Sequence, residues 1–394
     1  MLRNRLILLL FIVGSGILVG HVGGSVSYLL FYCSLILPLL AIFYVVFVYL
    51  KFCIYQEIDS KILVKEELVP YLFKLSNEDM LSYIKIKVTF MKDYSDVDRM
   101  NQETDYSLLP GEEITCSTKL CCHYRGEYKV GIDYVTVSDF LNLFRITYPC
   151  KSAIEVKVFP RILHIERLVI APRCEDIKSQ PFMIQSQQVI PDVEVRNYQT
   201  SDSRKMIHWK ATAKQHEILV RKYTEEPKSE LVVLLDLQMN KSQLKERIIV
   251  EDKLIEATLA LADYFVRNNT PIVILYDFNG IHRMPVYNKS DFDQLYQFCS
   301  EVRFHSDKAV EWLLNLAIQQ STGQKLYCML LTASITNELC KKIYDFTSFG
   351  HELSMILTGD NHPQDVIDNV VDHIRLYQIK NSQEVKDVLE MEAV

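Results

Sequence analysis

Glycine and proline are scarce in this sequence, with 12 of each among 394 residues. Neither a GxxxxGK nor a GxGxxG pattern occurs, which excludes the glycine-rich loops that hold nucleotide phosphates. Long basic runs are also absent, and 43 Lys and Arg against 50 Asp and Glu give a net charge of −7, which disfavours a nucleic-acid-coating role. The chain is 49% hydrophobic and 24% charged, as in a folded protein, and its length predicts two or three structural units.

Charged residues are missing from one long stretch near the N-terminus. Residues 6–50 contain no Asp, Glu, Lys or Arg over a run of 45 residues. As a single helix this run would be ~68 Å long, about twice the ~30 Å hydrocarbon thickness of a bilayer, so we expect it to cross twice. Residues 1–52 are therefore predicted to form a transmembrane hairpin, with spans at about 6–24 and 27–50.

The charges that flank this hairpin predict its orientation. Arg3 and Arg5 precede the first span and Lys51 follows the second, whereas the connecting turn has no fixed positive charge. By the positive-inside rule we expect both termini and the soluble domains in the cytoplasm. A cleaved signal peptide is the alternative, but no small-x-small cleavage site is followed by polar sequence, and the second apolar run would still anchor the chain.

Small residues recur along the first span. Gly16, Gly20 and Gly24 are four residues apart, so they would line one helix face and permit close approach of another helix. We expect this face to pack against the second span, with dimerisation between chains as the alternative.

The ten cysteines show no CxxC pattern, which is typical of a protein kept in a reducing compartment. Cys116, Cys121, Cys122 and His123 form the one cluster in the sequence that suggests a metal. Adjacent residues of a strand point to opposite faces, so Cys121 and Cys122 cannot readily bind the same ion. We therefore expect structural thiols here.

Residues 57–190 have the pattern of β-strands. Hydrophobic and polar residues alternate over residues 84–90, which is the period of a half-buried strand. Residues 113–123 and 127–137 also alternate, and we expect them to pair as a hairpin that turns at residues 125–126. The region is predicted to form an antiparallel β-sandwich-like domain.

Residues 227–394 alternate between strand and helix patterns. Residues 231–235 form an apolar run typical of a buried strand, and residues 250–267 follow with a helical apolar face. Further strands are expected at 272–276, 325–331, 353–358 and 374–379, with helices at 308–319, 336–346 and 364–371. This order predicts a doubly wound α/β domain whose site lies at the carboxyl ends of the strands. The predicted fold class is thus multi-domain α+β, with the hairpin, the β-sandwich-like domain and the α/β domain in sequence.

Residues 191–226 join the two soluble domains and are rich in polar and aromatic side chains. Asp202 is predicted to cap a helix over residues 203–214, and residues 218–223 follow as a strand. The segment resembles the signature of the domain of unknown function 58 family, in which Arg-x-Tyr, Asp, Arg and Ile-His-Trp precede a strand that ends in Val-Arg. The matching residues are Arg196, Tyr198, Asp202, Arg204, His208, Trp209, Lys210 and Arg221.

Two earlier segments resemble the same family. Residues 125–128 read Arg-Gly-x-Tyr, and residues 139–144 read Asp-Phe-Leu-Asn-Leu-Phe where the family has Asp-Pro-Phe-Gly-Leu-Phe. Phe140 and Asn142 thus replace Pro and Gly, and Ser201 replaces a Gly of the signature. These departures leave the geometry of the turns open.

The resemblance implies a von Willebrand factor A-like domain after the signature, in a protein of the bacterial cell membrane. Members of the family commonly occur beside MoxR-type AAA+ ATPases. Such an ATPase, other membrane proteins and the lipid bilayer are therefore the expected partners, and nucleic acid is not.

Metal-binding A-like domains hold Mg²⁺ on an Asp-x-Ser-x-Ser loop after the first strand of the sheet. The matching positions here are Asp236, Gln238 and Asn240, so the acid is kept and both hydroxyls are replaced by amides. Thr332 and Ser334 follow a later strand without a second acid. Because amides crowd a small octahedral ion, we expect a degenerate loop and no cofactor, with Mg²⁺ binding as the alternative.

The signature also suggests a catalytic group, with His208 as general base, Asp202 orienting it, and Arg196 or Arg204 holding an anion. Asp202 and His208 are six residues apart, which does not place them on one helix face, and no nucleophile elbow, HExxH or paired-acid motif occurs.

We therefore expect a structural or interface role for the signature and no enzyme activity. The predicted function is a membrane-anchored, cytoplasm-facing scaffold or adaptor that works with the ATPase in assembly or maturation of a membrane or envelope complex. A membrane-bound hydrolase and a divalent-metal-dependent ligand-binding module are the alternatives.

Overall fold

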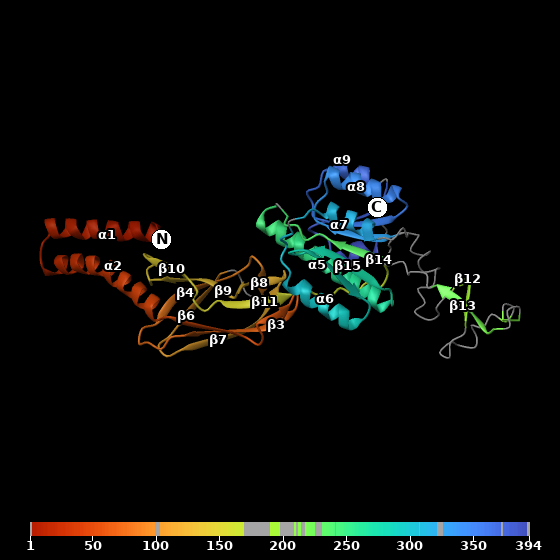
Figure 1. Ribbon diagram of the computed structural model, residues 1–394. Helices are drawn as coiled ribbons and strands as arrows, with labels where there is room; N and C mark the ends of the chain where they lie inside the picture. The colour runs from red at the N-terminus through yellow and green to blue at the C-terminus, as the bar shows by residue number, and fades with distance from the viewer. Residues whose placement is uncertain are drawn as a thin grey trace. The chain divides into compact units, whose positions relative to one another are not determined.

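The chain forms two compact units, Met1–Arg161 and Ile162–Val394, in the computed structural model drawn in Figure 1. The sequence predicted four parts, at residues 1–52, 57–190, 191–226 and 227–394. This division is finer than the two units and stays a prediction. The structure describes residues 2–98, 103–168, 190–197, 209, 212–213, 217–224, 231–240, 242–306, 308–320, 326–371 and 373–391, and of residues 103–104, 190–197, 220–224 and 320 it describes the backbone only.

Two apolar helices open the first unit. Helix α1 (Leu2–His21) and helix α2 (Ser25–Lys51) lie side by side and run in opposite directions (Figure 1). Gly23 and Gly24 turn the chain between them at φ of +61° and +90°, which is a backbone conformation that glycine adopts without steric cost. Both helices are long and apolar enough to cross a membrane.

Serine side chains mark the contact between the two helices. The Oγ atoms of Ser15 and Ser34 lie 3.2 Å apart, and both residues are buried. A Cβ on Gly16 would lie 3.6 Å from the Phe31 ring, but a Cβ on Gly20 would meet no atom within 4 Å. The predicted glycine face is therefore wrong beyond Gly16, because Gly20 points into open space and Gly24 belongs to the turn.

The rest of the first unit consists of short strands in three sheets, with orders β1-β3-β7-β5, β10-β9-β4-β6 and β2-β11-β8. Their inward-facing side chains form one hydrophobic core. All pairs are antiparallel except β2 with β11. The strands are β1 (Cys53–Ile58), β2 (Ile62–Val64), β3 (Leu68–Ser76), β4 (Tyr83–Phe90), β5 (Ser95–Val97), β6 (Glu103–Leu108), β7 (Glu113–Cys122), β8 (Gly126–Val130), β9 (Ile132–Ser138), β10 (Arg145–Pro149) and β11 (Ile154–Phe159).

The hairpin expected from residues 113–123 and 127–137 is wrong. Strand β7 pairs with β3 and β5, whereas β8 pairs with β11 and β9 pairs with β4 and β10. Gly126 and Gly131 take φ of +131° and +97°, so the chain changes direction twice and passes into other sheets. Each segment alternates because it is half-buried in its own sheet, and alternation alone does not identify the partner strand.

A buried carboxylate organises the loop between β9 and β10. Asp139 is fully buried, and its Oδ1 accepts hydrogen bonds from the backbone N–H groups of Leu143 at 2.8 Å and Phe144 at 2.7 Å. Its Oδ2 accepts a third from Leu141 at 3.0 Å. Asn142 has φ of +52°, a left-handed conformation that asparagine tolerates better than most residues. The replacement of the family's glycine by Asn142 thus leaves this turn intact.

The same loop holds the start of helix α1. The Asn4 side-chain amide donates to the carbonyl of Leu141 at 2.7 Å, and the Arg5 guanidinium donates to the carbonyl of Leu143 at 2.7 Å. Arg5 also lies over the Phe144 ring, 5.7 Å from its centroid. The end of the hairpin that carries both helix termini is therefore fixed to the β-strand part of the first unit.

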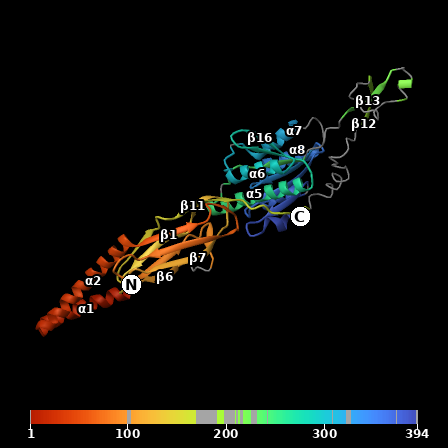
Figure 2. The same cartoon turned by 90° about the horizontal axis from the view of Figure 1, so that it is seen from below.

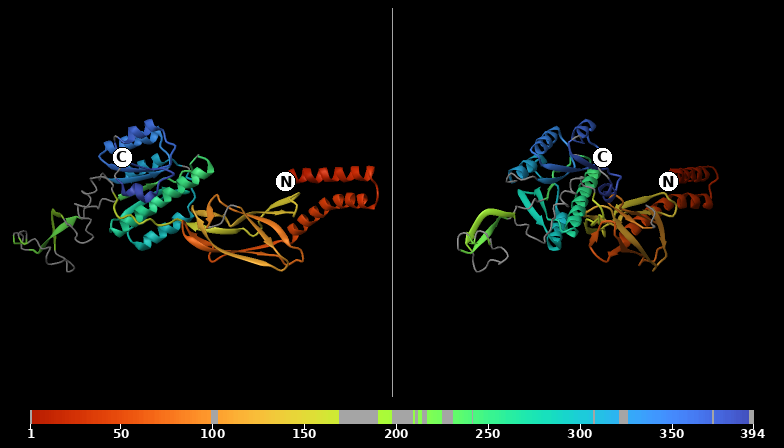
Figure 3. Two further views of the ribbon diagram at one scale, coloured as in Figure 1. Left: turned by 180° about the vertical axis from the view of Figure 1, so that it is seen from behind. Right: turned by 90° about the vertical axis from the view of Figure 1, so that its right-hand side faces the viewer.

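The second unit contains a six-stranded sheet in the order β16-β15-β14-β17-β18-β19, with helices on both faces (Figures 2 and 3). All strands are parallel except the edge strand β16. Helices α5, α6 and α10 contribute to one hydrophobic core, and α7, α8 and α9 to the other. The elements are β14 (Leu231–Leu235), α5 (Leu244–Arg267), β15 (Ile272–Asp277), β16 (Ile281–Val286), α6 (Lys289–Glu301), α7 (Val310–Gln320), β17 (Tyr327–Thr332), α8 (Asn337–Ser348), β18 (Glu352–Thr358), α9 (Gln364–Val371), β19 (Arg375–Ile379) and α10 (Val385–Glu390).

The predicted fold class is confirmed, with two apolar helices, a mainly antiparallel β-domain and a doubly wound α/β domain. In the second unit, sequence reasoning missed β16, α6 and α10. Strand β16 lies at the sheet edge, where most of its side chains, including those of His282 and Arg283, are exposed. Without a buried face it shows neither an apolar run nor clear alternation.

The Asp139 loop yields the first prediction. Asp139→Ala leaves three backbone N–H groups without their acceptor, so we expect the free energy of unfolding of the first unit to fall by about 3 kcal/mol or more. Denaturant unfolding of the full chain in detergent measures this loss. Asp105→Ala, at an exposed position on β6, is the matched control and should change stability little. Equal effects of the two substitutions would contradict the role given to Asp139.

Candidate functional site

Most of the predicted signature lies outside the described residues. This holds for Tyr198, Asp202, Arg204, His208 and Lys210, so their arrangement and the expected helix over residues 203–214 stay predictions. The described parts of the signature are the two strands that flank it and a few residues between them.

Strands β12 (Ile190–Asn197) and β13 (Leu219–Thr224) form an antiparallel pair. Their register places Arg196 opposite Val220 and Arg221 opposite Val195. The backbone N–H of the buried Leu219 donates to the Thr212 hydroxyl at 3.1 Å, which ties the preceding segment to β13. Trp209 is 70% exposed, so its indole is accessible.

A second group of polar residues lies at the carboxyl edge of the α/β sheet. Asp236 directly follows β14, and Asp277, Thr332 and Thr358 are the last residues of β15, β17 and β18. All four are buried, with exposures of 5% or less. Because these strands are parallel neighbours, their last residues lie along one edge. The strand order reverses between β14 and β17, and doubly wound folds commonly bind ligands at this point.

Asp236 joins the two central strands of this edge. Its Oδ2 accepts a hydrogen bond from the Thr332 hydroxyl at 2.6 Å, and its Oδ1 accepts from the Gln238 backbone N–H at 2.9 Å. Burial raises the pKa of Asp236 to about 6, and the negative charge of Glu311 adds to this, while the bonds from Thr332 and Gln238 act in the opposite direction.

Two neighbouring acids, Asp277 and Glu311, also accept hydrogen bonds from hydroxyls. Asp277 accepts from the Ser306 hydroxyl at 2.8 Å. Glu311, near the start of α7, accepts from the Thr336 hydroxyl at 2.7 Å. The same Thr336 oxygen caps helix α8 by accepting from the Leu339 backbone N–H at 3.0 Å. The carboxyl edge is thus a network of carboxylates and hydroxyls whose partners come from the chain itself.

The residues at the degenerate loop fit an octahedral Mg²⁺ ion poorly. Both oxygens of Asp236 accept hydrogen bonds, and Asn240 Oδ1 accepts from the backbone N–H and hydroxyl of Ser242 at 3.1 Å and 3.0 Å. Gln238 is exposed. A Mg²⁺ ion requires oxygen ligands at about 2.1 Å in near-octahedral geometry, and the four hydrogen bonds to Asp236 and Asn240 compete with it for these oxygens.

A polar cavity of about 140 Å³ opens beside this network, between the loops that follow β14, β17, β18 and β19. The His362 ring donates from Nε2 to the Thr358 carbonyl at 3.1 Å, and burial lowers the pKa of this histidine. Thr358 Oγ1 and Asn381 Oδ1 are buried without a hydrogen-bond partner among the described residues. Further lining residues are Asn240, Ser242, Glu246, Ser334, Asp360 and Asn361.

Sequence reasoning placed Asp236, Gln238, Asn240 and Thr332 at this edge but missed Asp277, Thr358 and the cavity. A usable signal was present, since Asp277 and Thr358 each follow an apolar run of the kind expected for a buried parallel strand. Asn381 and His362 carried no such signal, because their positions depend on loops whose course the sequence pattern does not predict.

Comparison with known proteins agrees with the resemblance noted above. Residues 194–292 match the family described as protein of unknown function DUF58. Residues 194–292 are thus similar to this family. The match begins in β12 and ends in α6, so it spans the junction and the first part of the α/β unit. No curated protein matches the chain.

Several solved structures are similar to parts of the chain. Proximal thread matrix protein 1 from the mussel byssus is 12% identical, with a TM-score of 0.31, and the match covers 41% of this chain and 45% of that protein. A von Willebrand factor type A protein from Catenulispora acidiphila is 10% identical, with a TM-score of 0.31, and the match covers 44% of this chain and 42% of that protein. The CARDB domain of the PF1109 protein from Pyrococcus furiosus is 16% identical, with a TM-score of 0.19, over 27% of this chain and 91% of that domain. The chain therefore spans less than half of the first two proteins.

The raised pKa of Asp236 predicts a pH-dependent stability. Because its pKa is about 6 in the folded chain against an ordinary 3.8, the folded state holds this proton more tightly than the unfolded state. Its contribution to stability is therefore fully present below about pH 4 and is lost as the pH rises to about 6, by on the order of 3 kcal/mol. Asp236→Asn mimics the protonated acid, since its amide can donate to Thr332 Oγ1 while that hydroxyl donates to the Ser334 carbonyl.

We expect Asp236→Asn to raise the stability of the full chain at pH 7.5 and to change it little at pH 4. Thermal unfolding of variant and wild type at both pH values measures the difference. Asp345→Asn, at an exposed position on α8, is the control. It should change the stability by the same amount at pH 4 and at pH 7.5. A variant that is less stable than the wild type at pH 7.5 would show that Asp236 is needed as an anion.

Proposed function

We propose that the chain is a membrane-anchored, cytoplasm-facing scaffold whose α/β domain docks a protein partner at the carboxyl edge of its sheet. The observation that carries this proposal is the carboxyl edge itself. A polar cavity opens there beside the switch point of the sheet, and the neighbouring acids accept hydrogen bonds from hydroxyls of the same chain. Such an edge presents a shaped polar surface to a partner.

The orientation of the anchor rests on the hairpin contacts. Asn4 and Arg5 bind the Asp139 loop, and α2 continues directly into β1, so both ends of the hairpin lie on the side of the folded part of the first unit. Arg3, Arg5 and Lys51 gather at this side, and the turn at residues 22–24 has no basic residue. The positive-inside rule then favours a cytoplasmic location for the soluble units.

The chemistry of the rim favours a partner with basic and polar side chains. Glu246 and Asp360 line the cavity and place two carboxylates at its rim. The exposed Trp209, between the two strands of the signature, offers an aromatic anchor of the kind that often dominates binding energy.

We propose a MoxR-type AAA+ ATPase as this partner, in assembly or maturation of a membrane or envelope complex. The support is the family resemblance, because members of the family commonly occur beside such ATPases. Scaffolding requires no catalytic group on this chain, and at the carboxyl edge the described acids are held by hydroxyls rather than set against a nucleophile.

Site-specific photo-crosslinking in the native membrane tests the proposal. A photoreactive amino acid at the exposed Asn361 lies on the cavity rim, and one at the exposed Phe349 lies at the opposite, amino-terminal edge of the sheet, just before β18. We expect the Asn361 position to crosslink an AAA+ ATPase at least tenfold more than the Phe349 position. Equal crosslinking at both positions, or an ATPase captured at Phe349 alone, would contradict docking at the carboxyl edge.

A further inference from the structure

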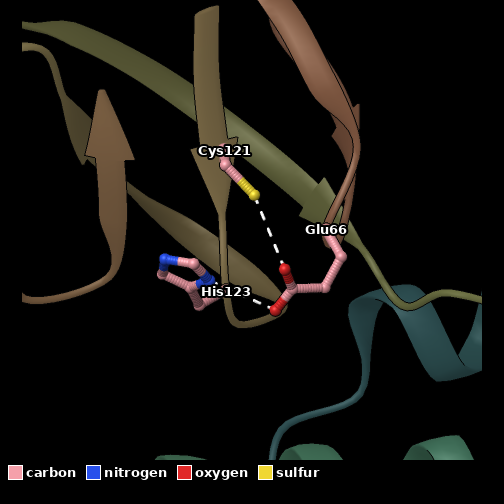
Figure 4. A group of neighbouring side chains, drawn as sticks. All are labelled: Glu66, Cys121 and His123. Carbon is pink, nitrogen blue, oxygen red and sulfur yellow. Dashed lines mark hydrogen bonds and ion pairs between the residues drawn. The ribbon is translucent and has the colours of Figure 1, made fainter. Parts of the chain in front are cut away.

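Three side chains with metal-binding chemistry converge at the surface of the first unit. Glu66 lies in the turn between β2 and β3, Cys121 lies near the end of β7, and His123 follows that strand (Figure 4). One oxygen, one sulfur and one ring nitrogen from these residues all lie within 4.8 Å of one another. The group is distinct from the carboxyl edge of the α/β sheet and plays no part in the function proposed above.

The local backbone explains why Cys121 and His123 share a face. Residues two apart on an extended chain point to the same side, while the residue between them points away. Cys122 accordingly is buried in the hydrophobic core, and Cys121 is partly exposed. The expectation that Cys121 and Cys122 cannot bind one ion therefore holds, but it overlooked the pair formed by Cys121 and His123.

Glu66 is brought to this pair by its backbone. Its N–H donates to the Cys122 carbonyl at 2.8 Å, which fixes the turn against the end of β7. Its φ of +61° is in the left-handed region, which glutamate occupies rarely. In this conformation the carboxylate lies between the other two groups, with Oε2 3.5 Å from Cys121 Sγ and Oε1 3.1 Å from His123 Nδ1.

These separations match the ligand spacing of a small tetrahedral ion. With zinc–ligand bonds of about 2.0–2.3 Å, two ligands of a tetrahedral site lie roughly 3.3–3.8 Å apart. The two contacts reach different oxygens of Glu66, and the three ligand atoms lie within 4.8 Å of one another, so side-chain shifts on the order of 1 Å would place all three donors around one ion. Their sulfur and nitrogen donors suit Zn²⁺ and disfavour Mg²⁺ or Ca²⁺, which prefer oxygen ligands.

A fourth residue orients the histidine. His123 Nε2 lies 3.1 Å from Asp96 Oδ2, on β5. In zinc proteins the ring nitrogen that does not bind the metal commonly donates to a carboxylate, which fixes the tautomer and the ring orientation. Here that bond would leave Nδ1 free to face the ion. The site is open to solvent, since the His123 and Glu66 side chains are 33% and 40% exposed.

We propose that Glu66, Cys121 and His123 form a binding site for Zn²⁺ or a similar transition-metal ion, with Asp96 as the positioning residue. The ligand atoms are a Glu66 carboxylate oxygen, Cys121 Sγ and His123 Nδ1, and a water molecule takes the fourth position. Binding breaks the S–H bond of Cys121 and the bonds from Cys121 and His123 to Glu66, and it releases the thiol proton, and any proton on Nδ1, to solvent. The ion joins the turn after β2 to the end of β7.

Cobalt spectroscopy on the full chain in detergent tests this proposal. Co²⁺ is added to chelator-treated protein, and a thiolate-to-cobalt charge-transfer band together with intense visible bands reports a tetrahedral site with a sulfur ligand. We expect one equivalent of Co²⁺ to give these bands and one equivalent of Zn²⁺ to remove them. Cys121→Ser and His123→Ala should each abolish the thiolate band or weaken Co²⁺ binding by more than tenfold.

Cys53→Ser is the matched control, because Cys53 is an exposed thiol at the start of β1 with no part in the group. This variant should bind Co²⁺ like the wild type, and Asp96→Ala should keep the thiolate band but weaken Zn²⁺ affinity by roughly 10- to 100-fold. Melting temperatures without metal show whether each variant is folded. Absence of a thiolate band in the wild type, or an unchanged band in folded Cys121→Ser, would overturn the proposal.

Discussion

The hydrogen bond between Thr332 and Asp236 joins the two central strands of the α/β sheet where the strand order reverses. Its 2.6 Å length and full burial make it costly to break, because the carboxylate would lose its partner in an environment without water. The hydrogen bonds that Thr332 and Gln238 donate to Asp236 compete with a hard cation for its carboxylate oxygens. The form of the carboxyl edge, and with it the docking role that we propose, depends on this bond.

A comparable constraint operates in the first unit. Asp139 closes the loop between β9 and β10 through three backbone N–H groups, and the carbonyls of that loop then receive Asn4 and Arg5 of helix α1. A single buried carboxylate thus determines how the apolar hairpin meets its β-domain. In both units an aspartate is held by donors of the chain itself.

Some parts of the fold and of the candidate sites could be predicted from the sequence and others could not, for physical reasons. The two apolar helices and the parallel strands were predictable from long apolar runs. Residues 231–235 form a strand that is buried on both faces, and residues 6–50 form helices apolar enough to cross a membrane. The pairing of residues 113–123 was not, because alternation reports a half-buried strand without naming its neighbour. Asp236 and Thr332 were found by comparison with the metal-binding loops of A-like domains, which follow strands of the sheet. Glu66 was missed because it approaches Cys121 and His123 from a turn 55 residues away in the sequence.

Calorimetric titration of Mg²⁺ into the full chain, compared with Asp236→Ala, tests the central claim about the carboxyl edge most directly. The Glu66, Cys121 and His123 group does not interfere, since Mg²⁺ prefers oxygen ligands. If Thr332 and the chain's own donors satisfy Asp236, neither protein should show saturable heat of binding at this loop. Saturable binding of one Mg²⁺ by the wild type that disappears in Asp236→Ala would contradict this account.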